Sequence, residues 1–392
     1  MTDNTKYYIW LTLGLGFASY KPYHIMALYD DVEVFYKGGE SEMRLCGILT
    51  ENEINKLLSA KLSDAEKIIE ESLKLGYTLL DISEYEYPQI LRSIDNAPAV
   101  LYIDGKLPDF DEVKSVSIVG TRKATVYGVR TAYELGANLS KRGFVVVSGG
   151  ALGIDCAAHR GVLQAGGRTV CVLGCGLDTE YLRENKAMRK QIAQRGAVIS
   201  EYPPGTPASP QNFPQRNRII SGLTYGTVVV EAPVKSGSMI TVNLALEQCR
   251  DVFAVMGNID SPYSEGSNAL IKDGAIPVTS YKDISEFYLG VDNSTLNNLS
   301  ITIADVKDVP TKLKNPADTT REDNIPVAAF NSNVTMTDEE NEIYFLLSHK
   351  PMHVDKIVEE ASLPAHTVLR TISSLELKGL IRNTEGRNYV II

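Results

Sequence analysis

Residues 144–163, FVVVSGGALGIDCAAHRGVL, decide the fold of this chain. Four consecutive apolar residues are typical of a strand buried on both faces, and a glycine-rich turn then leads into a helical stretch. Further strand-like runs flank this unit at 116–119, 169–173, 197–200, 227–230 and 252–255. Segments long enough for crossover helices separate them at 126–140, 156–165, 184–194 and 239–248. The alternation predicts a doubly wound α/β domain with a parallel sheet over residues 115–290.

Further segments surround this domain, because 392 residues exceed what one hydrophobic core usually organises. Residues 1–85 have the apolar spacing of short helices, punctuated by glycines, and predict a small helical module. Residues 86–114 predict an extended connector. Residues 291–336 are rich in Asn, Asp, Thr, Ser and Pro and predict a flexible linker. A capping box, three helical stretches and an alternating end predict a winged helix-turn-helix over 337–392.

Charge is distributed unevenly along the chain. The whole sequence carries a net charge of -10. Residues 115–280 contain 17 Lys and Arg against 12 Asp and Glu, a net of +5, so the remaining residues together carry -15. Residues 337–392 contain nine acidic and six basic residues, a net of -3. The central domain therefore suits a polyanion, whereas the C-terminal module is a poor match for duplex DNA.

The sequence contains no signal for a membrane, a metal or a cofactor. No apolar run approaches the roughly 18 to 20 residues of a membrane span, and no basic n-region opens the chain, which predicts a cytoplasmic protein. The odd number of cysteines, without paired CxxC spacing, predicts reduced thiols and no metal site. The P-loop motif is absent, and GCGLDT at 174–179 has Thr179 where a dinucleotide fingerprint has its third glycine, so we expect no bound cofactor.

The loops that follow the predicted strands offer donors suited to an anion. The carboxyl ends of parallel strands meet at one edge of a sheet, where ligands bind. A turn into a helix aims free amides at an anion, and Arg grips phosphate with two hydrogen bonds. The residues concerned are Gly120, Thr121, Arg122, Lys123, Ser148, Gly149, Gly150, Ala151, Lys186, Phe213, Arg216, Asn217, Arg218, Ser236, Gly237 and Ser238. Their convergence predicts an anion site at this edge.

Three titratable side chains near these loops are candidates for chemistry. Asp155 and His159 lie four residues apart on one helical face. They form either an acid/base pair or, as we favour, hydrogen bonds that pin the loop. Glu231 directly follows a predicted strand and is the best general-base candidate if the protein is an enzyme.

The central motifs, taken together, resemble the DNA-processing protein A (DprA/Smf) family. The resemblance covers the connector, the whole central domain and, more loosely, both ends of the chain. Its motifs are YPQILRSIDNAPAVLYIDG (87–105), SIVGTRKATVYG (117–128), VVSGGALGIDCAAHRGVL (146–163), VCVLGCGLDTEYLRENKAM (170–188), ISEYPPGTPASPQNFPQRNRIISGL (199–223), VVVEAPVKSGSMITVNLALEQCRDVFAVMGNI (228–259) and EGSNALIKDGA (265–275). Motifs of this length and order are highly specific.

The resemblance implies an architecture and a function. The fold would be an extended Rossmann-like parallel sheet between an N-terminal helical module, of the SAM or helix-hairpin-helix kind, and a C-terminal winged helix. The function would be single-stranded DNA binding during natural transformation, protection of incoming strands and loading of the RecA recombinase by a homodimer. A binding protein of this type is not an enzyme and has no catalytic residues.

The resemblance also implies roles for individual residues. Arg122 and the SGGA turn (148–151) are similar to the phosphate-gripping part of the family's pocket. Lys186, Arg216 and Arg218 would add positive charge, and Phe213 would stack on a base. This chain has Tyr181-Leu182 where many members have Tyr-Pro, which leaves the conformation of the loop carrying Lys186 open.

Two other functions remain as alternatives. Related Rossmann-like domains act as nucleotide phosphoribohydrolases, in which Glu231 would activate water. The PGGxGTxxE segment of such enzymes is missing, since the equivalent turn here is APVKSGSMITVNLALE (232–247). A transcription factor that senses a nucleotide and reports through the winged helix would need sequence-specific duplex binding, which the acidic C-terminal module disfavours.

Overall fold

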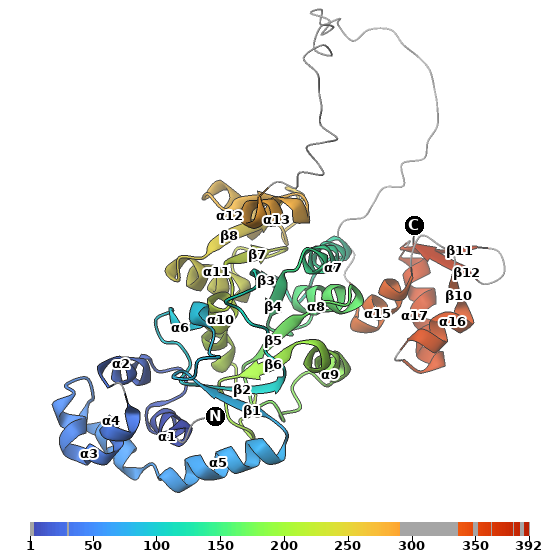
Figure 1. The fold of residues 1–392 in the computed structure, drawn as a ribbon. Helices are drawn as coiled ribbons and strands as arrows, with labels where there is room; N and C mark the ends of the chain where they lie inside the picture. The colour runs from blue at the N-terminus through green and yellow to red at the C-terminus, as the bar shows by residue number, and fades with distance from the viewer. Residues whose placement is uncertain are drawn as a thin grey trace, which may run out of the picture.

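The computed structural model describes residues 4–29, 31–290, 336–347, 352–361, 363–378, 380–384 and 388–391. Its centre is a nine-stranded sheet with the strand order β1-β2-β6-β5-β4-β3-β7-β8-β9 (Figure 1). Residues 291–335 lie outside the described residues, and with them all of the predicted linker except Met336. Within the described part of the chain, no helix is long and apolar enough to cross a membrane.

Seven neighbouring strands of the sheet are parallel, and the runs predicted from the sequence lie among them. These strands are β3 (Ser115–Val119), β4 (Val145–Ser148), β5 (Thr169–Leu173), β6 (Ala197–Ser200), β7 (Gly226–Val229), β8 (Asp251–Val255) and the short β9 (Ile276–Val278). Their β-branched residues are buried on both faces, as expected of a sheet covered by helices on both sides. The doubly wound α/β fold is thus confirmed.

Two strands from outside residues 115–290 extend this sheet in the antiparallel direction, which corrects the predictions of an extended connector and of a purely helical N-terminal module. β2 (Val100–Gly105) lies within the segment predicted as a connector, and it pairs antiparallel with β6. β1 (Thr78–Asp81) lies within the segment predicted as a helical module, and it pairs antiparallel with β2. Main-chain pairing with the exposed edge of β6 stabilises this extended stretch, so it forms two strands of the sheet rather than a tether.

Helices cover both faces of the sheet. α7 (Val126–Lys141), α8 (Ile154–Gln164) and α13 (Tyr281–Leu289) pack against one face, where Val116, Ile118, Val146 and Phe253 are buried. α6 (Gln89–Arg92), α10 (Asn212–Gly222), α11 (Gly237–Glu247) and α12 (Glu265–Lys272) cover the other face. α9 (Lys186–Arg195) follows the short 3-10 helix η1 (Arg183–Asn185) and packs beside α8 on β5 and β6.

The N-terminal module is a cluster of five helices that shares its core with the sheet. They are α1 (Thr5–Leu15), α2 (Tyr20–Leu28), α3 (Val32–Leu45), α4 (Glu51–Ser59) and α5 (Leu62–Lys74). The buried Trp10 on α1 donates from Nε1 to the carbonyl oxygen of Ala60 at 3.0 Å. Thr5 donates to the buried carboxylate of Asp81 at 2.6 Å, which fixes α1 to the end of β1.

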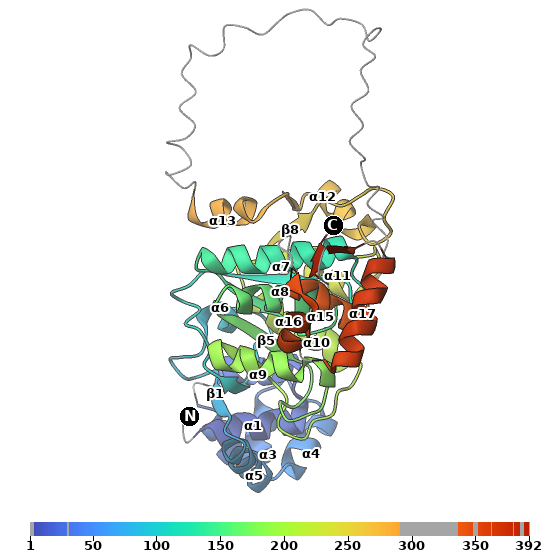
Figure 2. The same cartoon turned by 90° about the vertical axis from the view of Figure 1, so that its right-hand side faces the viewer.

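The C-terminal module has the elements of a winged helix. α15 (Asp338–Leu346), α16 (Val354–Glu360) and α17 (Ala365–Leu377) form its helices. The wing strands β11 (Ile381–Thr384) and β12 (Asn388–Ile391) pair with each other, and the two-residue β10 (Met352–His353) pairs with β12. The capping box predicted from Thr337 and Glu340 is present. Figure 2 shows this module lying in front of α8 and α9, beside the central sheet.

Candidate functional site

The order of the strands reverses at β3, which has β4 on one side and β7 on the other. Open α/β sheets bind ligands in the crevice at such a point, beyond the carboxyl ends of the strands. A pocket of about 440 Å³ lies here. It brings together many of the residues predicted from the sequence, namely Gly120, Thr121, Arg122, Ala151, Phe213, Arg216, Asn217, Ser236, Gly237 and Ser238. Loops far apart in the sequence therefore form one site.

Phe213, in the first turn of α10, forms a wall of the pocket together with two arginines. The guanidinium carbon of Arg122 lies 5.7 Å from the centroid of its ring, and that of Arg216 lies 5.9 Å away. The ring of Tyr181 contacts Phe213 with a centroid separation of 4.9 Å. Arg122 is exposed, lines the pocket and forms no ion pair within the described residues, so its donors are available to an anion. Positive charge therefore lies beside an aromatic surface.

Arg216 is built into the floor of the pocket and is only 4% exposed. Its Nη1 donates to the carbonyl oxygens of Gly149, at 2.9 Å, and Val172. Desolvation lowers its pKa, and the nearby carboxylate of Asp155 opposes that shift. Two donors of Arg216 thus hold the ends of β4 and β5 together, which makes it a structural cation as well as a lining residue.

Asp155 corrects the expectation that the SGGA turn presents free amides. One carboxylate oxygen of this buried residue accepts hydrogen bonds from the backbone amides of Gly149, at 3.2 Å, and Ala151, at 3.3 Å. The side chain satisfies these donors locally, as short polar side chains do at helix starts. For Asp155 the loop-pinning interpretation is therefore confirmed. Burial raises its pKa to about 6.

The N-terminus of α11 opens into the pocket without a side-chain cap. The hydroxyls of Ser236 and Ser238 lie 2.7 Å apart at this end. A Cβ at Gly237 would meet open space, so this position adjoins the hollow of the pocket rather than packed atoms. The helix dipole and the unpaired first-turn amides of such a terminus favour an anion.

Several predicted residues do not line the pocket. Lys123 lies outside it, and Ser148, Gly149 and Gly150 are buried turn residues that do not line it. The ammonium of Lys186 lies 3.8 Å from the carboxylate of Glu180.

Arg218 also lies outside the pocket. Its guanidinium is 5% exposed and forms two hydrogen bonds to the carboxylate of Glu201, at 2.8 and 2.7 Å. The FPQRNR segment was expected as a loop and is instead the start of α10, on which residues two apart point in different directions. Pro214 is tolerated there because first-turn amides have no partner within the helix.

The candidate general base is held in a structural contact. Glu231 is buried and accepts hydrogen bonds from the backbone amide and the hydroxyl of Thr125, at 2.9 and 2.5 Å. Desolvation raises its pKa. His159 is also buried, and its Nδ1 lies 2.8 Å from the hydroxyl of Thr169. The described residues contain no group of three side chains that could hold a metal ion.

One residue of the site was missed at the level of sequence, and a second was assigned only part of its role. Tyr181 was quoted only as the neighbour of Leu182, which departs from the family's Tyr-Pro, yet its ring extends the aromatic wall of Phe213. Asp155 was expected to pin a loop, but it also lines the pocket. The available signal was its place directly after a glycine-rich turn, where an acidic residue in the first helical turn satisfies free amides.

Comparison with known proteins places this architecture in a family. Residues 78–289 match the family model described as DNA recombination-mediator protein A, and residues 327–387 match that of the DprA winged helix domain. DNA processing protein DprA of Bacillus subtilis is 42% identical over 211 residues, covering 54% of this chain and 71% of that protein. Protein Smf of Synechocystis is 34% identical over 339 residues, covering 82% of each.

A solved structure agrees with these relatives. DNA processing protein A (DprA) from Streptococcus pneumoniae superposes with a TM-score of 0.62 at 32% identity, covering 71% of this chain and 96% of that one. The solved structure supports the fold of the chain over this part, and the winged helix is matched by its own family model. The chain belongs to the DprA/Smf family.

Proposed function

We propose that this member of a recombination-mediator family binds single-stranded DNA in the pocket at the ends of β3 and β7. The observation that carries the proposal is the guanidinium of Arg122 lying over the ring of Phe213. A strand offers phosphates and unstacked bases side by side, whereas a duplex hides the faces of its bases. An exposed cation beside an aromatic wall matches the strand, because one unit can contact a phosphate and the other a base.

The ion pairs and the charge of the winged helix favour a single strand over a duplex as the ligand of this protein. Two cations on or directly after its third helix are used within the module: Arg370 pairs with Glu339 at 2.7 Å, and Lys378 pairs with Glu340 at 2.6 Å. A recognition helix needs free cations for the phosphates of a duplex. This pairing and the net charge of -3 fit contacts with a protein better than duplex reading.

The family resemblance also suggests a role for strand binding in the cell. We propose that the protein acts in the cytoplasm as a homodimer that protects incoming strands in natural transformation and loads the RecA recombinase onto them. Exposed apolar side chains that follow β8, Met256 at 45% and Ile259 at 87%, are candidates for a surface buried between two copies. Sedimentation of the Ile259→Ser variant tests this, since a lighter species is expected if the residue lies in the dimer interface.

The experiment that tests the proposed function is a competition assay. A labelled single-stranded oligonucleotide is bound to the protein and then displaced with unlabelled strand, duplex or mononucleotide. We expect displacement by strand and little by duplex. Displacement by mononucleotide together with release of free base would support the phosphoribohydrolase alternative and contradict the proposal. The contact of Glu231 with Thr125 argues against that alternative, because both carboxylate oxygens already accept hydrogen bonds.

A further inference from the structure

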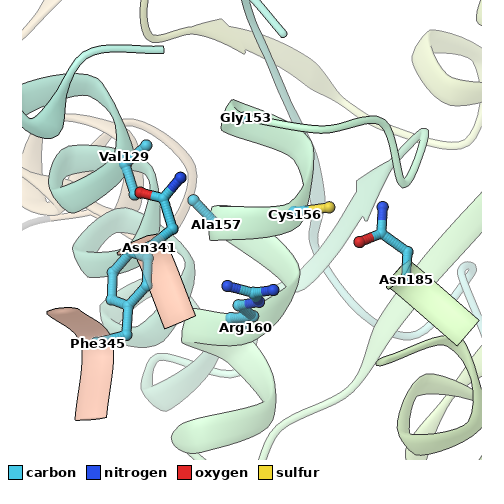
Figure 3. Close-up of a pocket in the computed structure, with 8 residues that line it drawn as sticks. All are labelled: Val129, Gly153, Cys156, Ala157, Arg160, Asn185, Asn341 and Phe345. Atoms are coloured by element: carbon cyan, nitrogen blue, oxygen red, sulfur yellow. The ribbon is translucent and has the colours of Figure 1, made fainter. Parts of the chain in front are cut away.

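The winged helix lies against the face of the central domain that α7 and α8 form. Phe345 on α15 stacks on Tyr133 of α7, with ring centroids 4.9 Å apart and an angle of 24°. Phe345 also packs against the apolar core beneath α7 and α8, and Val126 packs against the core of the winged helix. Figure 3 shows Phe345 and Asn341 of α15 next to Val129, Ala157 and Arg160. The docking is therefore a specific contact.

This contact is imperfectly packed. A small cavity remains between the two surfaces, lined by Asn341 and Phe345 on one side and by Arg160 and Asn185 on the other. The carboxamide oxygen of Asn341 is buried and has no hydrogen-bond partner among the described residues. A buried acceptor without a partner opposes docking. The unpaired acceptor therefore weakens the docking of the winged helix on α7 and α8, so this interface can open.

The covered face carries positive charge. Arg130 is exposed on α7, and Arg160 is half-buried on α8. The charge of Arg130 reaches the docked module, since it opposes the desolvation that raises the pKa of Tyr344. The segment placed on this face begins DEENE at 338–342. Glu339 and Glu340 of this segment pair with Arg370 and Lys378 inside the winged helix, so these two acids are not used on Arg130 or Arg160.

The covered face adjoins the strand pocket through the SGGA turn. Asn185 lines the interface cavity and donates to the carbonyl oxygen of Gly150 at 3.1 Å. Gly153 lines the same cavity, and a Cβ there would lie 2.8 Å from the carbonyl oxygen of Arg122. Ala151, between these two glycines, lines the pocket. A strand that leaves the pocket past α8 would reach Arg160 next.

We infer that the α7 and α8 face carrying Arg130 and Arg160 is a second segment of the single-strand track, and that the winged helix is its competing occupant. This inference rests on the proposed function. A short strand fills only the pocket and leaves the winged helix docked. A longer strand places phosphates on these arginines and displaces the winged helix, so docking lowers the affinity for long strands alone.

The test compares two labelled oligothymidylates, of about 6 and about 20 nucleotides, a range that spans common single-strand sites. Phe345→Ser removes the stack on Tyr133. We expect this variant to bind the long strand about fivefold more tightly, in the range usual for coupled sites, and the short strand unchanged. Leu369→Ser is the matched control, because Leu369 is 51% exposed on α17 and lines neither cavity. It should bind both strands like wild type.

Hydrogen exchange of the amides of α15 in the full-length protein measures directly whether the winged helix is docked. We expect faster exchange in α15 when the long strand is added to wild type, and no change with the short strand. In the double variant, Arg160→Ala should abolish the increase in affinity for the long strand that Phe345→Ser produces. It should leave the affinity for the short strand unchanged. Equal affinity of wild type and Phe345→Ser for the long strand, with α15 still protected, would overturn the inference. Failure of the short strand to bind would instead contradict the proposed function itself.

Discussion

The guanidinium of Arg122 lies over the ring of Phe213, with 5.7 Å between the guanidinium carbon and the ring centroid. Arg122 follows β3 and Phe213 begins α10, so the sheet brings together residues that are 91 positions apart in the sequence. Their proximity joins a phosphate donor to a stacking surface.

Phe213 is expected to contribute through stacking. We predict that Phe213→Ala weakens strand binding by about 1 to 3 kcal/mol, the usual cost of losing one base–aromatic stack, without changing the salt dependence. Phe213→Tyr keeps the ring and should bind almost like wild type. Equilibrium titrations at two salt concentrations measure both quantities. A large change of salt slope in Phe213→Ala would show that the ring acts only by positioning Arg122.

The open N-terminus of α11 allows a charge to be added without steric conflict. We predict that Gly237→Asp lowers strand affinity by about 1 kcal/mol or more, because a carboxylate replaces the favourable field at a helix N-terminus. Its thermal stability should be maintained, since a Cβ there meets open space. Gly237→Ala is the control and should bind normally. Unchanged strand affinity of Gly237→Asp would show that the N-terminus of α11 is not part of the binding site.

The raised pKa of Asp155 predicts a pH dependence. Its pKa of about 6 in the folded protein exceeds the ordinary aspartate value of 3.8. The folded state therefore takes up a proton as the pH falls through about 6, which relieves the cost of burying the charge and stabilises the fold. The pocket also gains positive charge. Strand affinity should thus be higher near about pH 5 than near about pH 7.5, and Asp155→Asn should flatten this dependence.

Arg218 is expected to affect stability rather than binding. Arg218→Met leaves the carboxylate of Glu201 buried and unpaired, which should cost about 3 to 5 kcal/mol of unfolding free energy. The double variant with Glu201→Leu should recover much of this loss, because it removes the unpaired charge. Urea unfolding measures the stability, and strand affinity per folded molecule should stay near the wild-type value. A stable Arg218→Met variant that no longer binds DNA would show that Arg218 belongs to the binding site.

The sequence was informative about the sheet because buried parallel strands have continuous β-branched runs, such as TVCVL at 169–173. It did not reveal that β1 and β2 join the sheet. Their pairing depends on the edge of β6, which is more than 90 residues beyond β2 in the sequence, and no local pattern encodes such a partner.

The sequence predicted those residues of the pocket whose position depends on the order of the strands. Gly120, Arg122 and Ser236 meet because they follow neighbouring strands. The separate roles of Arg216 and Arg218 depend on the direction of side chains on α10, which was not expected to be a helix. The use of two amides of the SGGA turn by Asp155 depends on local hydrogen bonds that spacing alone does not specify.

The most direct test of the account is strand binding by wild type and Arg122→Ala, measured side by side by fluorescence anisotropy at about 50 and about 200 mM salt. Lys123→Ala removes an equal charge from outside the pocket and serves as the control. We predict that Arg122→Ala binds more weakly by about 1 to 3 kcal/mol and has a smaller salt slope, because one phosphate contact is lost. Arg122→Ala binding with wild-type affinity and salt slope would contradict a strand site at the ends of β3 and β7.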